Sequence, residues 1–113
     1  MFLVTVEKDQ EVVETVGAAV AARGVRNGSI SLIGAVQECT VSVMNKDDAL
    51  FDRLRSYDQP FELTGTGEVV DGSVHLHVVL AGEDVTAAGH LHRAVVRDFF
   101  VRAYISPLDQ AAN

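Results

Sequence analysis

Residues 61–82 read FELTGTGEVVDGSVHLHVVLAG and decide the fold class of this chain. Two β-rich runs flank Asp71-Gly72, a pair that is typical of the tight turn between antiparallel strands. In the second run the side chains alternate between two faces, and the face that includes Leu76 and Leu80 is apolar. The stretch therefore predicts a β-hairpin with one face against a hydrophobic core.

The rest of the chain adds one helix and further strands. Helical spacing of apolar residues predicts a helix that begins with Asp9 as its N-cap and ends at Gly24. Strands are expected at residues 2–7, 30–36 and 38–44, and at residues 90–105 as one long strand or as two strands joined at Asp98. Residues 45–60 fit a short helix or a hairpin or long loop. One helix and about six strands in hairpin-like order predict an α+β fold around a mainly antiparallel sheet.

Two glycine positions carry separate expectations. Gly34 interrupts a strand pattern, which indicates a bulge or a close approach of another backbone. Gly65-Thr66-Gly67 lacks the lysine of a phosphate-binding loop and sits inside a strand pattern, so we expect a β-bulge there. Residues 83–89 are expected to form the connection that follows the hairpin.

Length and composition indicate a folded protein. The 113 residues predict one domain over residues 1–113, with residues 108–113 as a frayed tail, and the hydrophobic content of 48% argues against intrinsic disorder. We expect no secretory leader, because residues 1–10 lack positive charge before a long apolar run, and the apolar runs are shorter than the ~20 residues of a membrane span. Cys39 is the one cysteine, so no intrachain disulfide forms, and we expect an inert, partly buried thiol. These features predict a soluble, cytoplasmic protein without membrane contact.

The charge balance disfavours nucleic acid as a partner of the isolated domain. The formal net charge is −7, and the nearest approach to a basic patch is the spaced set Arg93, Arg97 and Arg102. Proteins that bind duplex DNA tightly usually present a basic surface to the phosphates.

All four histidines lie in two His-x-His pairs, His75 with His77 and His90 with His92. Residues i and i+2 of a strand point to the same face, so each pair projects together. If the two strands are neighbours, three or four imidazoles converge. Imidazole suits zinc, copper, iron or nickel, and three protein ligands leave an open position whereas four usually make a structural site. The alternative is that the histidines line a subunit contact, with pH sensitivity.

Four carboxylates are candidates for a general base or for a partner of a metal-bound histidine. They are Glu62, Glu68, Glu83 and Asp98, and the sequence selects none of them. Most such residues in proteins are solvated surface charges.

The chain resembles the PPC (plants and prokaryotes conserved) domain family, in its stand-alone prokaryotic form. The matching segments are GVRNGSISLIGAV (24–36), PFELTGTGEVVDGSVHLHVVLAG (60–82) and AGHLHRAV (88–95). Their order and spacing fit across nearly the whole chain. The combination of these motifs is specific, although no single motif is.

The resemblance implies a fold, an assembly and a set of metal ligands. It implies an α+β fold with a mainly antiparallel sheet flanked by helices, and a homotrimer. By motif position it assigns a divalent metal, zinc, to His75, His77 and His90. His92 lies outside the motif, which leaves it as a fourth ligand, a residue that supports the ligands or a bystander.

The sequence also departs from the family pattern. It contains no Arg-Gly-Arg core, so the DNA-binding AT-hook of the plant members is absent from it. Relatives carry two glycines before the second histidine motif and a glycine after it, where this chain has Ala88-Gly89 and Arg93-Ala94. The glutamate common in the last strand is replaced by the sequence DFFVR, which puts any role of that glutamate in doubt.

Three functions remain open from the sequence. The first is a trimeric metal-binding module that binds a small molecule or a protein and acts in regulation. The second is a metal-dependent enzyme of hydrolase or lyase/hydratase type with an open three-histidine site. The third is a DNA-associated regulator, which the acidic charge and the missing AT-hook disfavour. A cupin-like oxygenase fits less well, because the glutamate and the later histidine of that motif are misplaced here.

Overall fold

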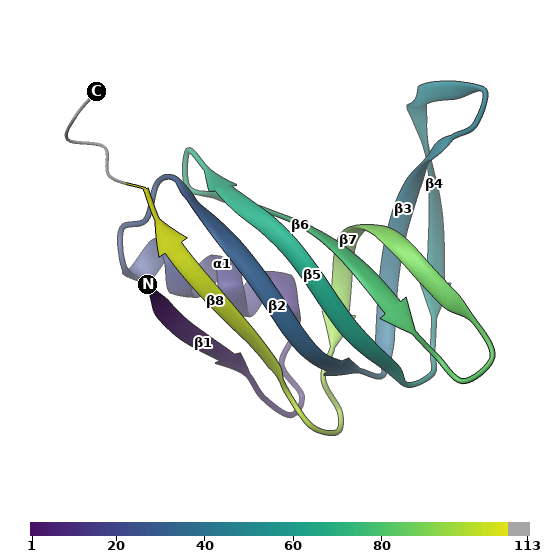
Figure 1. Cartoon of the computed structure of the whole chain (residues 1–113), viewed down its shortest axis with the longest axis horizontal. Coiled ribbons are helices and arrows are strands. Elements are labelled where there is room, and N and C mark those ends of the chain that lie inside the picture. Colours follow the sequence, from purple (N-terminus) through teal and green to yellow (C-terminus); the bar gives the residue numbers. More distant parts are fainter. Residues whose placement is uncertain (109–113) are drawn as a thin grey trace.

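The computed structural model describes residues 1–108, which form one helix and eight strands. The elements follow one another as β1 (Phe2–Val6), α1 (Val12–Ala22), β2 (Gly28–Val36), β3 (Glu38–Asn45), β4 (Asp48–Tyr57), β5 (Phe61–Val70), β6 (Ser73–Ala81), β7 (Thr86–Val95) and β8 (Val101–Pro107). The strands form one sheet in the order β1-β8-β2-β5-β6-β7-β3-β4 (Figure 1), and every pairing is antiparallel. The antiparallel sheet is confirmed, but it is accompanied by a single helix within residues 1–108 and not by several.

The hairpin that decides the fold class is β5–β6. The pairing runs from Glu62 with Ala81 to Val70 with Ser73, and the turn between them is Asp71-Gly72. Both turn residues have positive φ, 50° and 83°, which matches the right-handed twist of the flanking strands. Leu76, Val78 and Leu80 are buried on one face of β6, as the alternation predicts.

The helix ends as expected but begins differently. Gly24 has φ of 67° and its N–H donates to Ala21, so it terminates α1. The N-cap is Glu11 and not Asp9, because the Glu11 carboxylate accepts the N–H groups of Val13 and Glu14. Asp9 instead lies in the preceding turn at φ of 68°.

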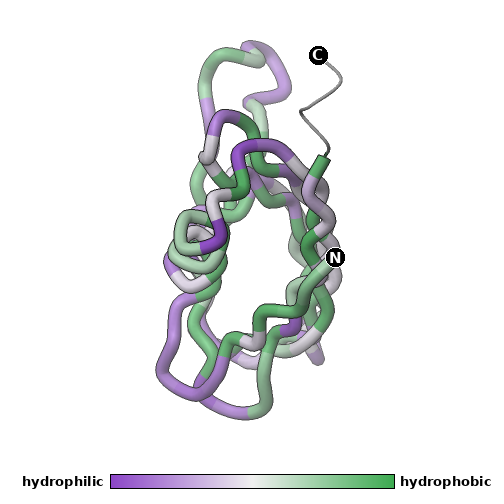
Figure 2. The backbone as a smooth tube through the Cα atoms, turned by 90° about the vertical axis from the view of Figure 1, so that its left-hand side faces the viewer, coloured by the Kyte–Doolittle hydropathy of each residue, from purple (hydrophilic) through white to green (hydrophobic). Residues whose placement is uncertain are grey.

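The core lies between α1 and the curved sheet. Val12, Val16 and Val20 of the helix are fully buried, and α1 packs against β1, β6 and β7. Figure 2 shows the sheet curling around the interior with α1 along one side. Since one face of β6 and β7 is committed to this core, the other face of these strands is left outward.

The polar middle of the chain forms a hairpin, one of the two alternatives. β4 pairs with β3 at the edge of the sheet, and this hairpin extends beyond the other strands (Figure 1). Leu50, Phe51 and Leu54, whose spacing also fits a short helix, are all exposed on β4. The β3–β4 hairpin thus carries apolar side chains without a core of its own.

The last two strands are separate, as one alternative predicts. Residues 96–100 connect β7 to β8, and the side-chain oxygen of Gln37 accepts the N–H groups of Arg97 and Asp98. The connection expected over residues 83–89 is shorter in the structure, because β6 ends at Ala81 and β7 begins at Thr86. A tail at residues 108–113 was expected. Leu108 donates its N–H to the Asn27 carbonyl, and residues 109–113 lie outside the described part of the chain.

Close backbone approach explains the strand glycines. A Cβ at Gly34 would collide with the carbonyl of Phe100, which confirms the expected approach. The bulge expected at Gly65-Thr66-Gly67 is wrong, since β5 pairs in unbroken register with β2 and β6. A Cβ at Gly67 would meet the His75 carbonyl, so these glycines are required by tight strand packing.

The single helix within residues 1–108, α1, does not combine the length and the apolar character needed to cross a membrane.

Candidate metal centre

Three histidines meet on the outward face of the sheet. His75 and His77 lie on β6 with the buried Leu76 between them, and His90 lies on β7. β6 and β7 are neighbours in the sheet, and His77 is the direct cross-strand partner of His90. The structure therefore brings together the two His-x-His segments, as strand periodicity predicts.

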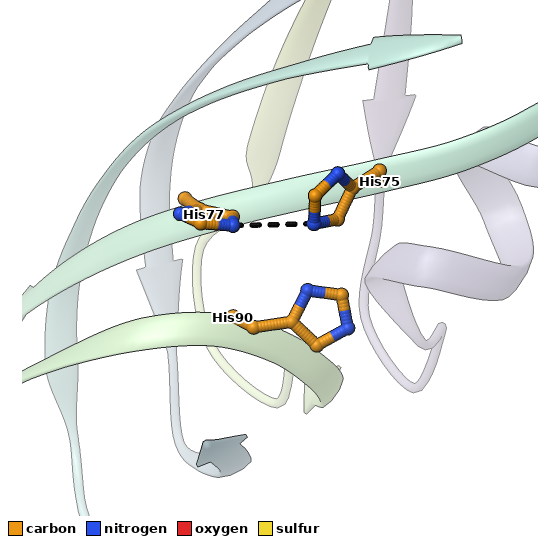
Figure 3. Close-up of side chains that lie close together, drawn as sticks. All are labelled: His75, His77 and His90. Carbon is orange, nitrogen blue, oxygen red and sulfur yellow. Dashed lines mark hydrogen bonds between the residues drawn. The ribbon is translucent and has the colours of Figure 1, made fainter. Parts of the chain in front are cut away.

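The spacing of the imidazoles suits a single metal ion. One nitrogen from each of His75, His77 and His90 can be chosen so that all lie within 4.8 Å of one another. The Nε2 atoms of His75 and His77 are 3.2 Å apart (Figure 3). Zinc–nitrogen bonds of about 2.0–2.1 Å at a tetrahedral angle separate two ligand atoms by about 3.3 Å. The observed separation is close to that value.

The surroundings of His90 favour the neutral form of its imidazole. Burial lowers the pKa of His90 below its usual value of 6.5, and the neighbouring His92, His75 and His77 lower it further. Asp52, on β4, acts in the opposite sense. A neutral imidazole is the form that donates a lone pair to a cation.

His92 lies beside the cluster but is not one of the three histidines whose ligand nitrogens lie together. The register between β3 and β7 shifts at this point, because Thr40 pairs with Arg93 while Val41 pairs with Leu91. His92 is thus the extra residue of a bulge, and its Nε2 atom lies 2.7 Å from the hydroxyl of Ser42. Its ring centroid is 4.7 Å from that of His90.

Ser42 is a site residue that the sequence did not single out. It is the buried polar residue of β3 and the cross-strand partner of His90. The alternation Val41-Ser42-Val43 gives no sign that the hydroxyl meets a histidine 50 positions later. Ser42 lies at the histidines because β3 and β7 are neighbours in the sheet. This pairing is known only from the sheet topology.

Of the four carboxylates considered from the sequence, Glu68 lies at the histidines. It pairs across β5–β6 with His75, and its Oε2 atom is 3.7 Å from Nδ1 of His75. Glu62 and Glu83 line a different hollow, and Asp98 lies in the β7–β8 connection.

Two hollows lie on the surface near these strands. A depression of about 410 Å³ adjoins His77 and is also lined by Thr64, Thr66, Val79 and Ala88. A larger hollow of about 860 Å³ is lined by Phe61, Phe99, Phe100 and Arg102 among others, and by no histidine. Of the two hollows, the smaller one is thus the one that adjoins the histidine cluster, through His77.

Cys39 is not positioned for chemistry. Its side chain is buried, and desolvation raises the pKa of the thiol to about 11. The thiolate, which is the nucleophilic form, is therefore scarce at neutral pH.

A model of the Plants and Prokaryotes Conserved (PCC) domain matches residues 1–109. The chain belongs to this family. The match confirms the family resemblance that the motifs indicate, and it covers nearly the whole PCC chain. No protein of the curated set matches it.

Solved structures share the fold of this PCC chain. A metal-containing protein of Archaeoglobus fulgidus is 22% identical, with a TM-score of 0.79, over 96% of this chain and 79% of that one. A candidate DNA-binding protein of Bacteroides thetaiotaomicron is 24% identical, with a TM-score of 0.78, over 96% and 78%. The alpha-acetolactate decarboxylase of Bacillus subtilis is 14% identical, with a TM-score of 0.64, over 93% of this chain and 52% of that one. At these identities the likeness is one of fold.

Proposed function

We propose that this PCC-domain chain is a homotrimeric zinc-binding protein that serves as a regulatory module for a small molecule or a protein. His75, His77 and His90 hold the metal. The convergence of their three imidazoles from β6 and β7, with ligand atoms within 4.8 Å, carries the proposal. The fold likeness to a metal-containing archaeal protein supports it.

Zinc fits the donor set. Three neutral imidazole nitrogens on an exposed face make an all-nitrogen site, and zinc accepts such ligands in tetrahedral geometry with one position open. Copper and nickel compete for the same nitrogens, so the ion held in the cell also depends on availability. A buried, unpaired Cys39 fits a reducing compartment, in line with a cytoplasmic location.

The exposed side chains on the outward face of the sheet support the proposal that the subunits assemble through this face. A transverse row runs across the paired strands from Tyr104 through Ser31 and Thr66 to His77 and His90. The neighbouring row places Ile33 and Val79 on the same face, with exposed fractions of 54% and 49%. Thr64 lies between them in that row, and exposed apolar side chains that gather on one face are typical of contact surfaces. A trimer would have a mass of about 36 kDa, three times 12.1 kDa, in light scattering, and a species of 12.1 kDa would contradict it.

Metal content tests the metal site. Tag-free protein is purified with zinc, dialysed against buffer and analysed by mass spectrometry, beside His75→Ala/His77→Ala. We expect about one zinc per chain in the wild type and little in the double variant. His92→Ala is the matched control, since it removes a neighbouring imidazole and leaves the three proposed ligands. Equal zinc in wild type and double variant would contradict the assignment.

A metal-dependent enzyme of lyase or hydrolase type is the second candidate. It is favoured by the 410 Å³ depression next to His77, which offers room for a small substrate. Thr64 and Thr66 line this depression and could offer their hydroxyls to the substrate. The fold likeness to a decarboxylase points to carbon–carbon lyase chemistry. A bound zinc would supply Lewis acidity or a water of lowered pKa. Release of CO₂ from acetolactate by zinc-loaded protein, absent in His75→Ala/His77→Ala, would support this candidate over a pure binding role.

A further inference from the structure

Glu68 and His75 form a cross-strand pair on the face that carries the histidines. They are direct partners in the β5–β6 register, and Glu68 Oε2 lies 3.7 Å from His75 Nδ1. Directly opposed side chains of an antiparallel pair are close enough to interact. Glycine at Gly67 permits this approach, because a Cβ there would meet the His75 carbonyl and the side chain of Leu76.

The two nitrogens of His75 face different partners. Nε2 lies 3.2 Å from Nε2 of His77, inside the cluster, while Nδ1 faces the carboxylate of Glu68. Metal-binding histidines commonly donate the N–H of the other nitrogen to a carboxylate, which fixes the tautomer and raises the basicity of the ligand. His75 is oriented for that arrangement.

The other two histidines face hydroxyl groups across their strands. Thr66 is opposite His77, and Ser42 is opposite His90 with its hydroxyl close to His92. Among the described residues, Glu68 is thus the carboxylate that is directly paired with one of the three imidazoles. Three neutral imidazoles leave the charge of a divalent ion uncompensated, and a nearby carboxylate offsets part of it.

We propose that Glu68 is a positioning residue of the metal centre. When the ion is bound, the Glu68 carboxylate closes the 3.7 Å separation and accepts the Nδ1–H of His75. This contact leaves Nε2 of His75 free to bind the ion and raises metal affinity. The inference rests on the proposed zinc site and adds the residue that tunes it. Glu68 does not itself bind the metal.

Zinc affinity measured against a chromophoric chelator tests the inference in the full-length chain. Glu68→Gln keeps the shape and removes the charge, and Glu68→Ala removes the acceptor. We expect both to bind zinc about 10–100-fold more weakly than the wild type. Glu62→Gln is the matched control, because Glu62 is on the same strand and same face but away from the histidines, and we expect its affinity to stay within about twofold of the wild-type value.

A direct view of the hydrogen bond comes from two-bond ¹H–¹⁵N NMR spectra of the zinc-loaded protein. We expect His75 to appear as the Nδ1–H tautomer with slow proton exchange in the wild type. In Glu68→Gln, that proton should exchange faster and shift upfield. A change in general stability does not select one imidazole proton, so this signal separates positioning from a structural role.

The outcomes distinguish the inference from the proposed function. If the wild type binds no zinc, both fall. If the wild type binds zinc and the two Glu68 variants match it in affinity and in the His75 proton signal, the positioning role is wrong and the zinc site stands. The visible spectra of the cobalt-loaded wild type and the cobalt-loaded Glu68→Ala variant can also be compared. If the variant spectrum shows the loss of one ligand, Glu68 is itself a ligand and the inference is wrong.

Discussion

His77 on β6 and His90 on β7 are direct cross-strand partners, so their imidazoles meet because of a single register of two neighbouring strands. A slip of one residue in that register would turn either side chain to the core face. The sheet register therefore sets the backbone positions of the candidate metal centre. The chain needs no loop movement to bring the imidazoles together.

His90 and His92 should differ sharply in their importance for metal binding. We expect His90→Ala to weaken zinc binding by at least about 100-fold, because one of three ligands is lost. His92→Ala should retain one zinc per chain, because Nε2 of His92 lies at the Ser42 hydroxyl. Isothermal titration of both variants measures this, and equal losses would make His92 a ligand.

The Glu11 carboxylate should contribute strongly to stability. It accepts the N–H of Val13 and of Glu14 at the start of α1, and its Oε2 atom also accepts the N–H of Ala94 on β7. We expect Glu11→Ala to lower the free energy of unfolding by about 2 kcal/mol, since a cap and a hydrogen bond between elements are lost together. Urea unfolding provides the measurement.

Glu14→Ala is the control for Glu11→Ala. Glu14 also lies in the first turn of α1 and is exposed, so its removal should cost less than about 1 kcal/mol. Equal effects of the two substitutions would show that the charge near the helix start matters and that the specific hydrogen bonds do not.

Acid should weaken the ion pair that connects β3 to the β7–β8 connection. The hydrogen bond from Arg97 holds the pKa of Glu38 below its usual value of 4.5, with a smaller contribution from Arg93. A lowered pKa in the folded state means that the stabilisation is present above pH 4.5 and is lost as the pH falls through the folded-state pKa. Urea unfolding at pH 6 and at about pH 3.5 should show a smaller pH-dependent loss for Glu38→Gln than for the wild type. The same loss in both would exclude Glu38 as a contributor.

DNA binding by this chain should be weak. Each chain has a formal charge of −7, and a trimer would carry −21, three times that value. We expect no retardation of a duplex at 150 mM salt and at most weak, salt-sensitive retardation at low salt. Affinity that persists at 150 mM salt would point to a basic surface made by assembly.

The fold could be predicted where local chemistry determines it. Asp71-Gly72 specifies the β5–β6 turn, and Gly24 ends the helix, because both depend on backbone angles that few residues adopt. The N-cap was misplaced at Asp9, since the choice between Asp9 and Glu11 depends on the N–H of Ala94 across the fold. The expected bulge at Gly65 and Gly67 failed for a similar reason, because the neighbouring strands that require these glycines are distant in sequence.

The candidate site was predictable in its histidines but not in its surroundings. Strand periodicity alone places His75 with His77 on one face. His90 joins them because β6 and β7 are adjacent strands. The direction of His92 depends on a bulge against β3, and Ser42 is on a strand that comes much earlier in the chain. Glu68 could not be separated from Glu62, Glu83 and Asp98 until the β5–β6 register paired it with His75.

Anomalous X-ray scattering from zinc-loaded crystals tests the central claim most directly. Data collected on both sides of the zinc absorption edge locate the ion and identify the element. We predict one anomalous peak per chain, within bonding distance of a nitrogen from each of His75, His77 and His90, with Glu68 near Nδ1 of His75 and outside bonding distance of the ion. A crystal from protein soaked in zinc that shows no peak at these imidazoles, or a peak held by other side chains, would contradict the account.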